Sequence, residues 1–185
     1  MPGAVELKSD IWTYQEYLEL PPDGKVYQII RGELYMVPAP ATYHQEVAIN
    51  LTLIIWNYVK KTGWGKIYNA PIDVIFTSTD IVQPDIVGIS KDRFGIVKEN
   101  GVFGAPDFVA EILSPSTLSI DTKLKKALYE RHGVFEYWLV YPEEKKVESF
   151  LLRQGSYTGP KAYLRDEEAE VTSIPGLKVD LKEVF

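Results

Sequence analysis

Two carboxylates in extended apolar segments are the first residues whose types and spacing could do chemistry. Glu111 interrupts the run "DFVAEIL" (107–113), and Asp85 opens the run "DIVGI" (85–89). A carboxylate buried in apolar surroundings is costly unless a cation, a metal ion or hydrogen-bond donors compensate it. If the two runs form neighbouring strands, the acids make an oxygen site that suits Mg²⁺, which keeps several waters, or Mn²⁺ in its place. The other interpretation is that Asp85 only ends a loop and Glu111 pairs with a lysine.

A lysine in reach of Glu111 comes from the helix that the sequence predicts next. The segment "DTKLKKALYERHG" (121–133) has helical spacing and ends at a glycine, which is typical of a helix stop. Lys125 falls at the edge of its buried stripe, where a lysine can bury its stem and direct its ammonium toward the sheet. A solvated surface lysine is the competing interpretation. Lys123 and Lys126 are expected to be solvated or to contact a phosphate backbone.

The remaining segments supply the sheet and helices that must hold these residues. A capping-box pattern, Thr13 with Glu16, predicts a short first helix, and Thr42 with Gln45 repeats it before a long helix that ends at Gly63. Short runs with strand-like patterns, separated by Gly, Pro and Asn, are spread over most of the chain. The predicted strands at 107–113 and 136–141 flank the helix from Asp121 and are expected to be neighbours. We therefore predict an α/β fold with a mixed sheet flanked by helices and additional C-terminal strands.

Composition limits the classes of protein that the chain can belong to. With 185 residues, we expect one domain spanning 1–185. The chain has no cysteine and only two histidines, which excludes thiol chemistry and a three-histidine metal site. The net charge of −6 argues against a general basic coat for nucleic acid but leaves room for a local patch. The N-terminus "MPGAVELKSD" has no basic start followed by an apolar run, and we expect a cytoplasmic protein that does not enter a membrane.

Several motifs in order resemble a known family. Pro84-Asp85 followed by Glu111 resembles the PD-(D/E)XK nuclease superfamily, and three further segments are similar to the Uma-two family of restriction-endonuclease-like proteins. These segments are "YQIIRGELYMVPAPATYHQ", "GAPDFVAEILSPST" and "DTKLKKALYERHGVFEYWLVYP". The resemblance runs from about residue 13 to about residue 150, and the chain beyond it adds little.

The resemblance implies a restriction-endonuclease-like fold and a metal-dependent phosphodiesterase site acting on DNA. Asp85 and Glu111 match the metal-binding acids, and Glu33 in "RGEL" matches a further acid of the family, expected to hold a second metal ion or to orient the attacking water. Lys125 matches the family's helix lysine. His44 and Asp107 also match positions of the family. We predict that these two residues and Lys123 contact the substrate.

One position departs from the superfamily pattern. Two residues after Glu111, where the superfamily carries a lysine, this chain has Leu113. Either Lys125 supplies the missing ammonium, which predicts a Mg²⁺-dependent endonuclease, or the site is degenerate and the fold serves as a module for nucleic-acid or protein interaction. By analogy with enzymes that cut both strands of a duplex, the nuclease interpretation also suggests a homodimer.

Overall fold

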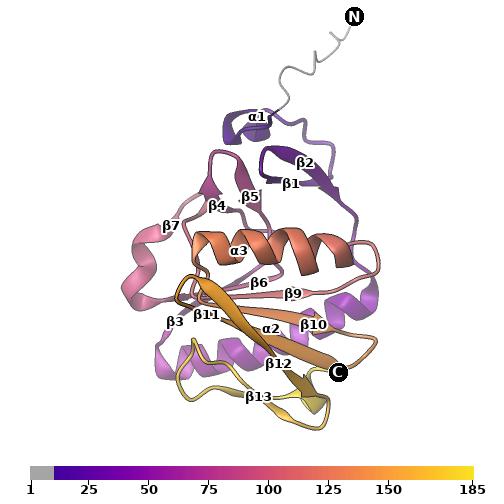
Figure 1. Cartoon of the computed structure of the whole chain (residues 1–185), viewed down its shortest axis with the longest axis vertical. Coiled ribbons are helices and arrows are strands. Elements are labelled where there is room, and N and C mark those ends of the chain that lie inside the picture. Colours follow the sequence, from indigo (N-terminus) through magenta and orange to yellow (C-terminus); the bar gives the residue numbers. More distant parts are fainter. Residues whose placement is uncertain (1–10) are drawn as a thin grey trace, which may run out of the picture.

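The computed structural model describes residues 11–185. Residues 1–10, on which the expected absence of a signal segment rests, lie outside the described residues. A central sheet of six strands has the order β12-β11-β10-β9-β6-β3, and an outer sheet of six strands has the order β2-β1-β5-β4-β8-β7 (Figure 1). The fold class is therefore α/β with mixed sheets and helices, as predicted, although the strands divide among two six-stranded sheets and one two-stranded sheet rather than forming one.

The strands of the central sheet are β3 (Gly65–Asn69), β6 (Ile86–Ser90), β9 (Phe108–Ile112), β10 (Glu136–Tyr141), β11 (Lys146–Arg153) and β12 (Ser156–Leu164). Those of the outer sheet are β1 (Val26–Ile30), β2 (Glu33–Val37), β4 (Val74–Thr77), β5 (Asp80–Val82), β7 (Val97–Lys98) and β8 (Gly101–Phe103). A C-terminal ribbon pairs β13 (Glu168–Glu170) with β14 (Lys178–Asp180). The helical elements are α1 (Tyr14–Leu18), α2 (Thr42–Thr62), η1 (Lys91–Ile96), η2 (Ile120–Lys125), α3 (Lys126–His132) and η3 (Leu181–Glu183).

Strand β9 lies in the middle of the central sheet and buries both of its faces. It pairs antiparallel with β6 and parallel with β10, and η2 and α3 connect it to β10, as the predicted strand–helix–strand unit requires. All five of its residues are buried, which explains why the run is apolar except for Glu111. The two faces of this strand pack into different cores.

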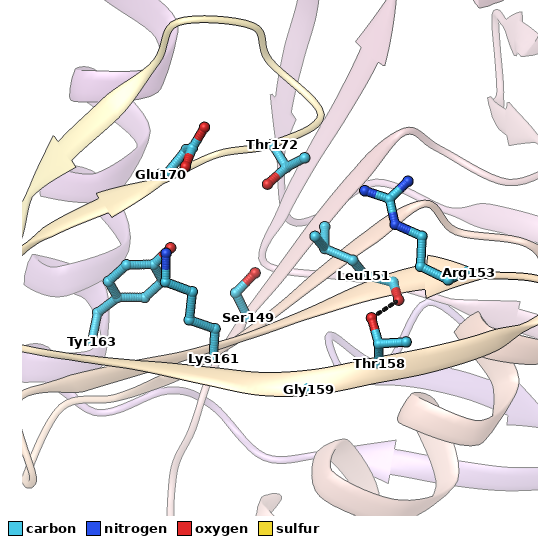
Figure 2. Close-up of a pocket in the computed structure, with 9 residues that line it drawn as sticks. All are labelled: Ser149, Leu151, Arg153, Thr158, Gly159, Lys161, Tyr163, Glu170 and Thr172. Carbon is cyan, nitrogen blue, oxygen red and sulfur yellow. Dashed lines mark hydrogen bonds between the residues drawn. The ribbon is translucent and has the colours of Figure 1, made fainter.

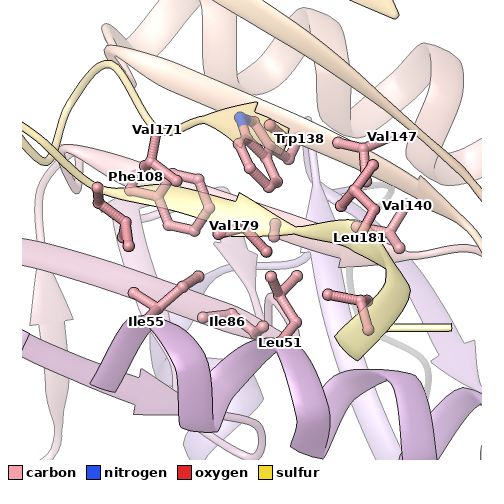
Figure 3. Packing of buried hydrophobic residues seen from close by; sticks show 14 of the residues in the cluster. Leu51, Ile55, Ile86, Phe108, Trp138, Val140, Val147, Val171, Val179 and Leu181 are labelled. Atoms are coloured by element: carbon pink, nitrogen blue, oxygen red, sulfur yellow. The ribbon is translucent and has the colours of Figure 1, made fainter. Parts of the chain in front are cut away.

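One core lies between the central sheet and α2. Phe108, Ala110 and Ile112 of β9 meet the buried face of α2 and the chain after residue 169. Figure 3 shows Leu51 and Ile55 of α2 on one side of this cluster and Val179 of the C-terminal ribbon within it. The C-terminal segment therefore completes a core that the central sheet and α2 leave open.

The other core lies between the central sheet, α3 and the outer sheet. Val109 of β9 and Leu113, which directly follows this strand, pack there with Leu128 and Tyr129 of α3. Glu111 has the same strand parity as Val109 and Leu113, so its side chain enters this second core.

The helices agree with the sequence patterns except at two starts. Thr13 and Glu16 form the predicted capping box of α1, and α2 ends at Gly63 with φ 68°, a left-handed conformation that glycine adopts without strain. The second capping box is wrong: Thr42 is already helical, and the extended Ala41 precedes it without a side-chain cap. The predicted helix from Asp121 begins one residue earlier, and its first turns are a π-helix.

Among the described residues, no helix has the length and apolar character that crossing a membrane requires.

Candidate active site

Asp85 and Glu111 come from segments that are neighbours in the central sheet. β6 and β9 pair with Ile86 opposite Ala110, and Asp85 directly precedes β6 while Glu111 directly follows Ala110, so the two acids lie at the same end of this strand pair. The strands that carry the two acids are thus neighbours, as the sequence predicts.

Glu111 faces a cation and a phenol in an otherwise apolar core. Its side chain is 3% exposed, and its Oε1 accepts hydrogen bonds from Lys125 Nζ at 3.0 Å and from Tyr129 Oη at 2.5 Å. Burial raises the pKa of Glu111 from 4.5 to about 8, against the opposing effect of the Lys125 charge. Near neutral pH the carboxyl group of Glu111 is therefore largely protonated. A further cation beside it would favour the loss of this proton.

Lys125 is buried between two carboxylates rather than lying at the helix boundary. Its side chain is 5% exposed, and Nζ lies 3.0 Å from Glu111 Oε1 and 3.1 Å from Asp121 Oδ1. Burial alone would lower the pKa of Lys125, but the charges of Glu111, Asp121 and Asp85 outweigh it and raise the pKa above its ordinary value. Lys125 therefore stays protonated, with its ammonium directed at the sheet.

The π-helical start explains how both helical residues reach the core. Asp121 and Lys125 are the buried residues of η2, and Leu128 and Tyr129 are those of α3. A π-helix is wider than an α-helix and often occurs at functional sites. Charged residues of η2 thus continue the buried face that apolar and aromatic residues form in α3.

Asp85 is held by a backbone amide and by a histidine from α2. The amide N–H of Ile112 donates to Asp85 Oδ2 at 2.8 Å, and His44 Nε2 lies 3.4 Å from the same oxygen. Burial acts to lower the pKa of His44, but the hydrogen bond and charge of Asp85 outweigh this and raise it. His44 Nδ1 is buried and has no hydrogen-bond partner.

The free oxygens of the two acids are the atoms that the predicted divalent cation would have to use. The hydrogen bonds among residues 11–185 engage Oδ2 of Asp85 and Oε1 of Glu111, which leaves the second oxygen of each carboxylate uncommitted. Asp121 Oδ1, although near Lys125, is buried without a hydrogen bond. Within this same part of the chain, no cluster of three or more acidic or histidine side chains is arranged to hold a metal. Mg²⁺ suits such a site because it is often bound by one or two carboxylates with water completing the shell.

Three other predicted site residues lie apart from this pair. Glu33 is exposed at the start of β2 in the outer sheet, where its carboxylate accepts a hydrogen bond from Tyr35 Oη. Asp107 precedes β9 and accepts a hydrogen bond from the Ser90 amide at 2.8 Å. Lys123 is exposed on η2. Among the residues described, no hydrogen bond or ion pair joins any of the three to Asp85 or Glu111, and their predicted roles stay predictions.

Sequence reasoning missed two residues that contact the buried pair. Asp121 was expected only as the helix start, and no site role was predicted for Tyr129. Asp121 lies four residues before Lys125 and Tyr129 four residues after it. This spacing could have indicated the contacts, because side chains four residues apart share one face of a helix. The surface role predicted for Lys126 needs amendment too, since its Nζ lies over the Phe150 ring at 4.0 Å.

One cleft on the surface of residues 11–185 is bordered by Asp85, and another lies away from both acids. A cleft of about 380 Å³ lies between α2 and the end of β3, and Asp85 is among its lining residues. The other, of about 360 Å³, is lined by β11, β12 and the segment around Glu170 (Figure 2). Ser149 in this second cleft faces the side of the sheet opposite Glu111, because it pairs with Trp138 while Glu111 pairs with Leu139.

Comparisons with known proteins place the chain. Among solved structures, a protein from Anabaena variabilis ATCC 29413, described as a "putative nuclease belonging to DUF820", is similar with a TM-score of 0.78 and 22% sequence identity. The alignment covers 94% of this chain and 97% of that one. No curated protein matches. A family model, Uma2, described as "Putative restriction endonuclease", matches residues 14–182, which extends beyond residue 150, where the motif resemblance ends. The chain belongs to the Uma2 family.

Proposed function

We propose that the protein is a Mg²⁺-dependent endonuclease that hydrolyses phosphodiester bonds in DNA. The observation that carries the proposal is the buried Lys125 ammonium, 3.0 Å from Glu111, on the helix that follows the strand of this acid. Membership of a nuclease family supports the reaction class. Metal dependence rests on the uncommitted oxygens of Asp85 and Glu111.

Asp85 and Glu111 would hold the ion, helped by the backbone carbonyl near Ile112. A bound Mg²⁺ supplies Lewis acidity toward a phosphoryl oxygen and an activated water. The Ile112 amide and His44 fix the Asp85 carboxylate, so that its free oxygen faces the site in a defined orientation. Tyr129 and Lys125 do the same for Glu111.

In this proposal Lys125 supplies the ammonium that the superfamily carries at the position held here by Leu113. Because the ammonium approaches Glu111 from the helix, it need not come from the strand position two residues later. A preorganised cation at this place stabilises negative charge that develops on the phosphate in the transition state. Its charge is permanent near neutral pH, since the neighbouring carboxylates raise its pKa.

Metal titration and cleavage together test the proposal. Asp85→Asn and Glu111→Gln should weaken Mn²⁺ binding sharply in calorimetry and abolish cleavage of plasmid DNA, while Asp92→Asn, an exposed carboxylate on η1, should change neither. Lys125→Met should bind the metal nearly normally and cleave about 10²-fold more slowly or worse, the scale of losing one preorganised electrostatic group.

The matched control is Lys126→Met, which removes an ammonium from the same helix and should cleave like the wild type. Metal binding that is unchanged in both acid variants would overturn the proposal. A wild type that binds DNA but never cleaves it would instead support the degenerate interaction module.

A further inference from the structure

The cleft beside Asp85 has the lining of a site for a nucleobase rather than for a phosphate. Its walls hold aliphatic side chains with a few uncharged polar groups: Gln45, Ala48, Ile49, Thr52, Leu53, Asn69 and Ala70, with Asp85 at its border. Apolar walls with a few convergent polar groups are typical of small-molecule and base pockets. The lining contains no lysine or arginine, so a phosphate would find no counter-charge in it.

The polar groups in the cleft are placed to meet the edge of a base. Asn69 donates through Nδ2 to Thr52 Oγ1 at 2.6 Å, which fixes the amide and leaves its Oδ1 as a hydrogen-bond acceptor. The Gln45 amide, one residue after His44 on α2, is exposed and supplies both a donor and an acceptor. An apolar wall and two amides suit the flat face and the polar edge of a heterocycle.

An exposed apolar stripe on α2 continues away from the cleft. Ile49 and Leu53 are 54% and 52% exposed, and Trp56, one turn further along, is 41% exposed. Lys60 Nζ lies 4.4 Å from the centre of the Trp56 ring. An aromatic ring with a neighbouring cation is the usual element of sequence-tolerant binding of single strands, in which bases stack and phosphates meet the charge.

We propose that the cleft beside Asp85 and the Trp56 ring hold unpaired bases next to the scissile phosphate, so that the preferred substrate is single-stranded DNA. Asp85 lines the cleft and is one of the two acids of the proposed metal site, so a nucleotide flanking the phosphate would reach the cleft directly. Bases that are stacked within a duplex cannot enter it, because their faces are covered. This inference rests on the proposed function, whose substrate it narrows.

Fluorescence anisotropy with three labelled DNA ligands tests the inference, both in EDTA and with Ca²⁺. The ligands are a short single strand, its duplex, and the same single strand with abasic sites in place of its bases. The wild type should bind the single strand more tightly than the other two. Trp56→Ala should weaken single-strand binding by about five-fold or more, as expected for the loss of one base stack. Leu53→Glu should weaken binding of the base-bearing strand but not of the abasic strand.

Leu164→Glu is the matched control, because Leu164 is 60% exposed on β12, away from the cleft, and it should leave all three affinities unchanged. Equal binding of duplex and single strand by the wild type, or an unchanged affinity in both cleft variants, overturns the inference. A Leu53→Glu variant that turns a dimer into a monomer without changing DNA affinity also overturns it, because the stripe is then an interface between copies.

The failure of this inference differs from that of the proposed function. If Asp85→Asn abolishes cleavage of every DNA form while the cleft variants keep wild-type binding, the nuclease stands and the base site falls. If the wild type cleaves nothing but Trp56→Ala loses single-strand binding, the base site stands and the nuclease falls.

Discussion

Replacing Lys125 by methionine should destabilise the protein, and by an amount that depends on pH. Methionine keeps the length of the aliphatic stem but removes the ammonium that lies 3.0 Å from Glu111 and 3.1 Å from Asp121. At an effective dielectric constant of about 20, the contact with the Asp121 carboxylate is worth about 5 kcal/mol of Coulomb energy, and the contact with Glu111 reaches this size only above about pH 8, where that group is ionised. Much of this is offset by the cost of burying the ammonium, and removing one partner of a buried pair typically costs about 3–5 kcal/mol. We expect a loss of this size in the free energy of unfolding at pH 7.

The loss should grow as the pH rises. Burial already raises the pKa of Glu111 to about 8 in the folded protein, compared with 4.5 for the ordinary group. For an acid whose pKa is raised by folding, the stabilisation is complete below its unfolded pKa and is lost as the pH rises through its folded pKa. Without Lys125 the pKa of Glu111 rises further, so the variant keeps losing stability above pH 8, where the wild type no longer does.

Urea unfolding followed by tryptophan fluorescence at pH 5, 7 and 9 measures this difference. Lys126→Met, which removes a cation over an aromatic ring, should cost about 1 kcal/mol or less at each pH. The double variant Glu111→Gln with Lys125→Met should recover part of the lost stability, because it removes one of the carboxylates left uncompensated. A Lys125→Met variant within about 1 kcal/mol of the wild type, at all three pH values, would refute the reasoning that this ammonium compensates the buried acids.

Three further predictions concern the same core. Mn²⁺ binding measured by calorimetry should strengthen about tenfold per pH unit from pH 6 to 8, because the ion displaces a proton from Glu111; a flat profile would contradict this. Tyr129→Phe removes a donor to Glu111 and should lower the free energy of unfolding in urea by about 1–3 kcal/mol. The loss should be larger in the metal-free protein than in the Mn²⁺-loaded one. Equal losses in both states would count against the pairing of Tyr129 with Glu111. Asp80→Ala removes the acceptor of Arg131 Nη2 at 2.9 Å and should lower the thermal midpoint by several degrees, about the effect of 1–2 kcal/mol. Asp166 is 77% exposed, and Asp166→Ala should leave the midpoint unchanged. Equal midpoints for the two variants would contradict the buried role of Asp80.

Local patterns were sufficient to predict the elements and the neighbouring acids. The apolar run around Glu111 predicts a strand buried on at least one face, and helical spacing with a terminal glycine predicts α2 and its end at Gly63. The parallel neighbours β9 and β10 follow from the helix between them. These features depend on contacts within a few residues or on one crossover connection. The spacing of apolar residues along the sequence is therefore enough to predict them.

The division into two sheets and the burial of Lys125 could not be predicted in the same way. Which strands pair is decided by long-range packing, and an exposed lysine and a buried lysine have the same local sequence. The π-helical turn that brings Asp121 and Lys125 to one face has no pattern that distinguishes it from an α-helix. The sequence predicts additional C-terminal strands but not where they pack, and Val179 of the C-terminal ribbon is fully buried in the core beneath α2.

Single-turnover cleavage of DNA with and without Mg²⁺ tests the central claim most directly. The wild type should cleave in Mg²⁺ and stop in EDTA. Asp85→Asn, which keeps the shape of the side chain but weakens its hold on a cation, should be slower by about 10²-fold or more. Cleavage that persists in EDTA, or an Asp85→Asn variant that cleaves at the wild-type rate, would contradict a metal-dependent site built on Asp85 and Glu111.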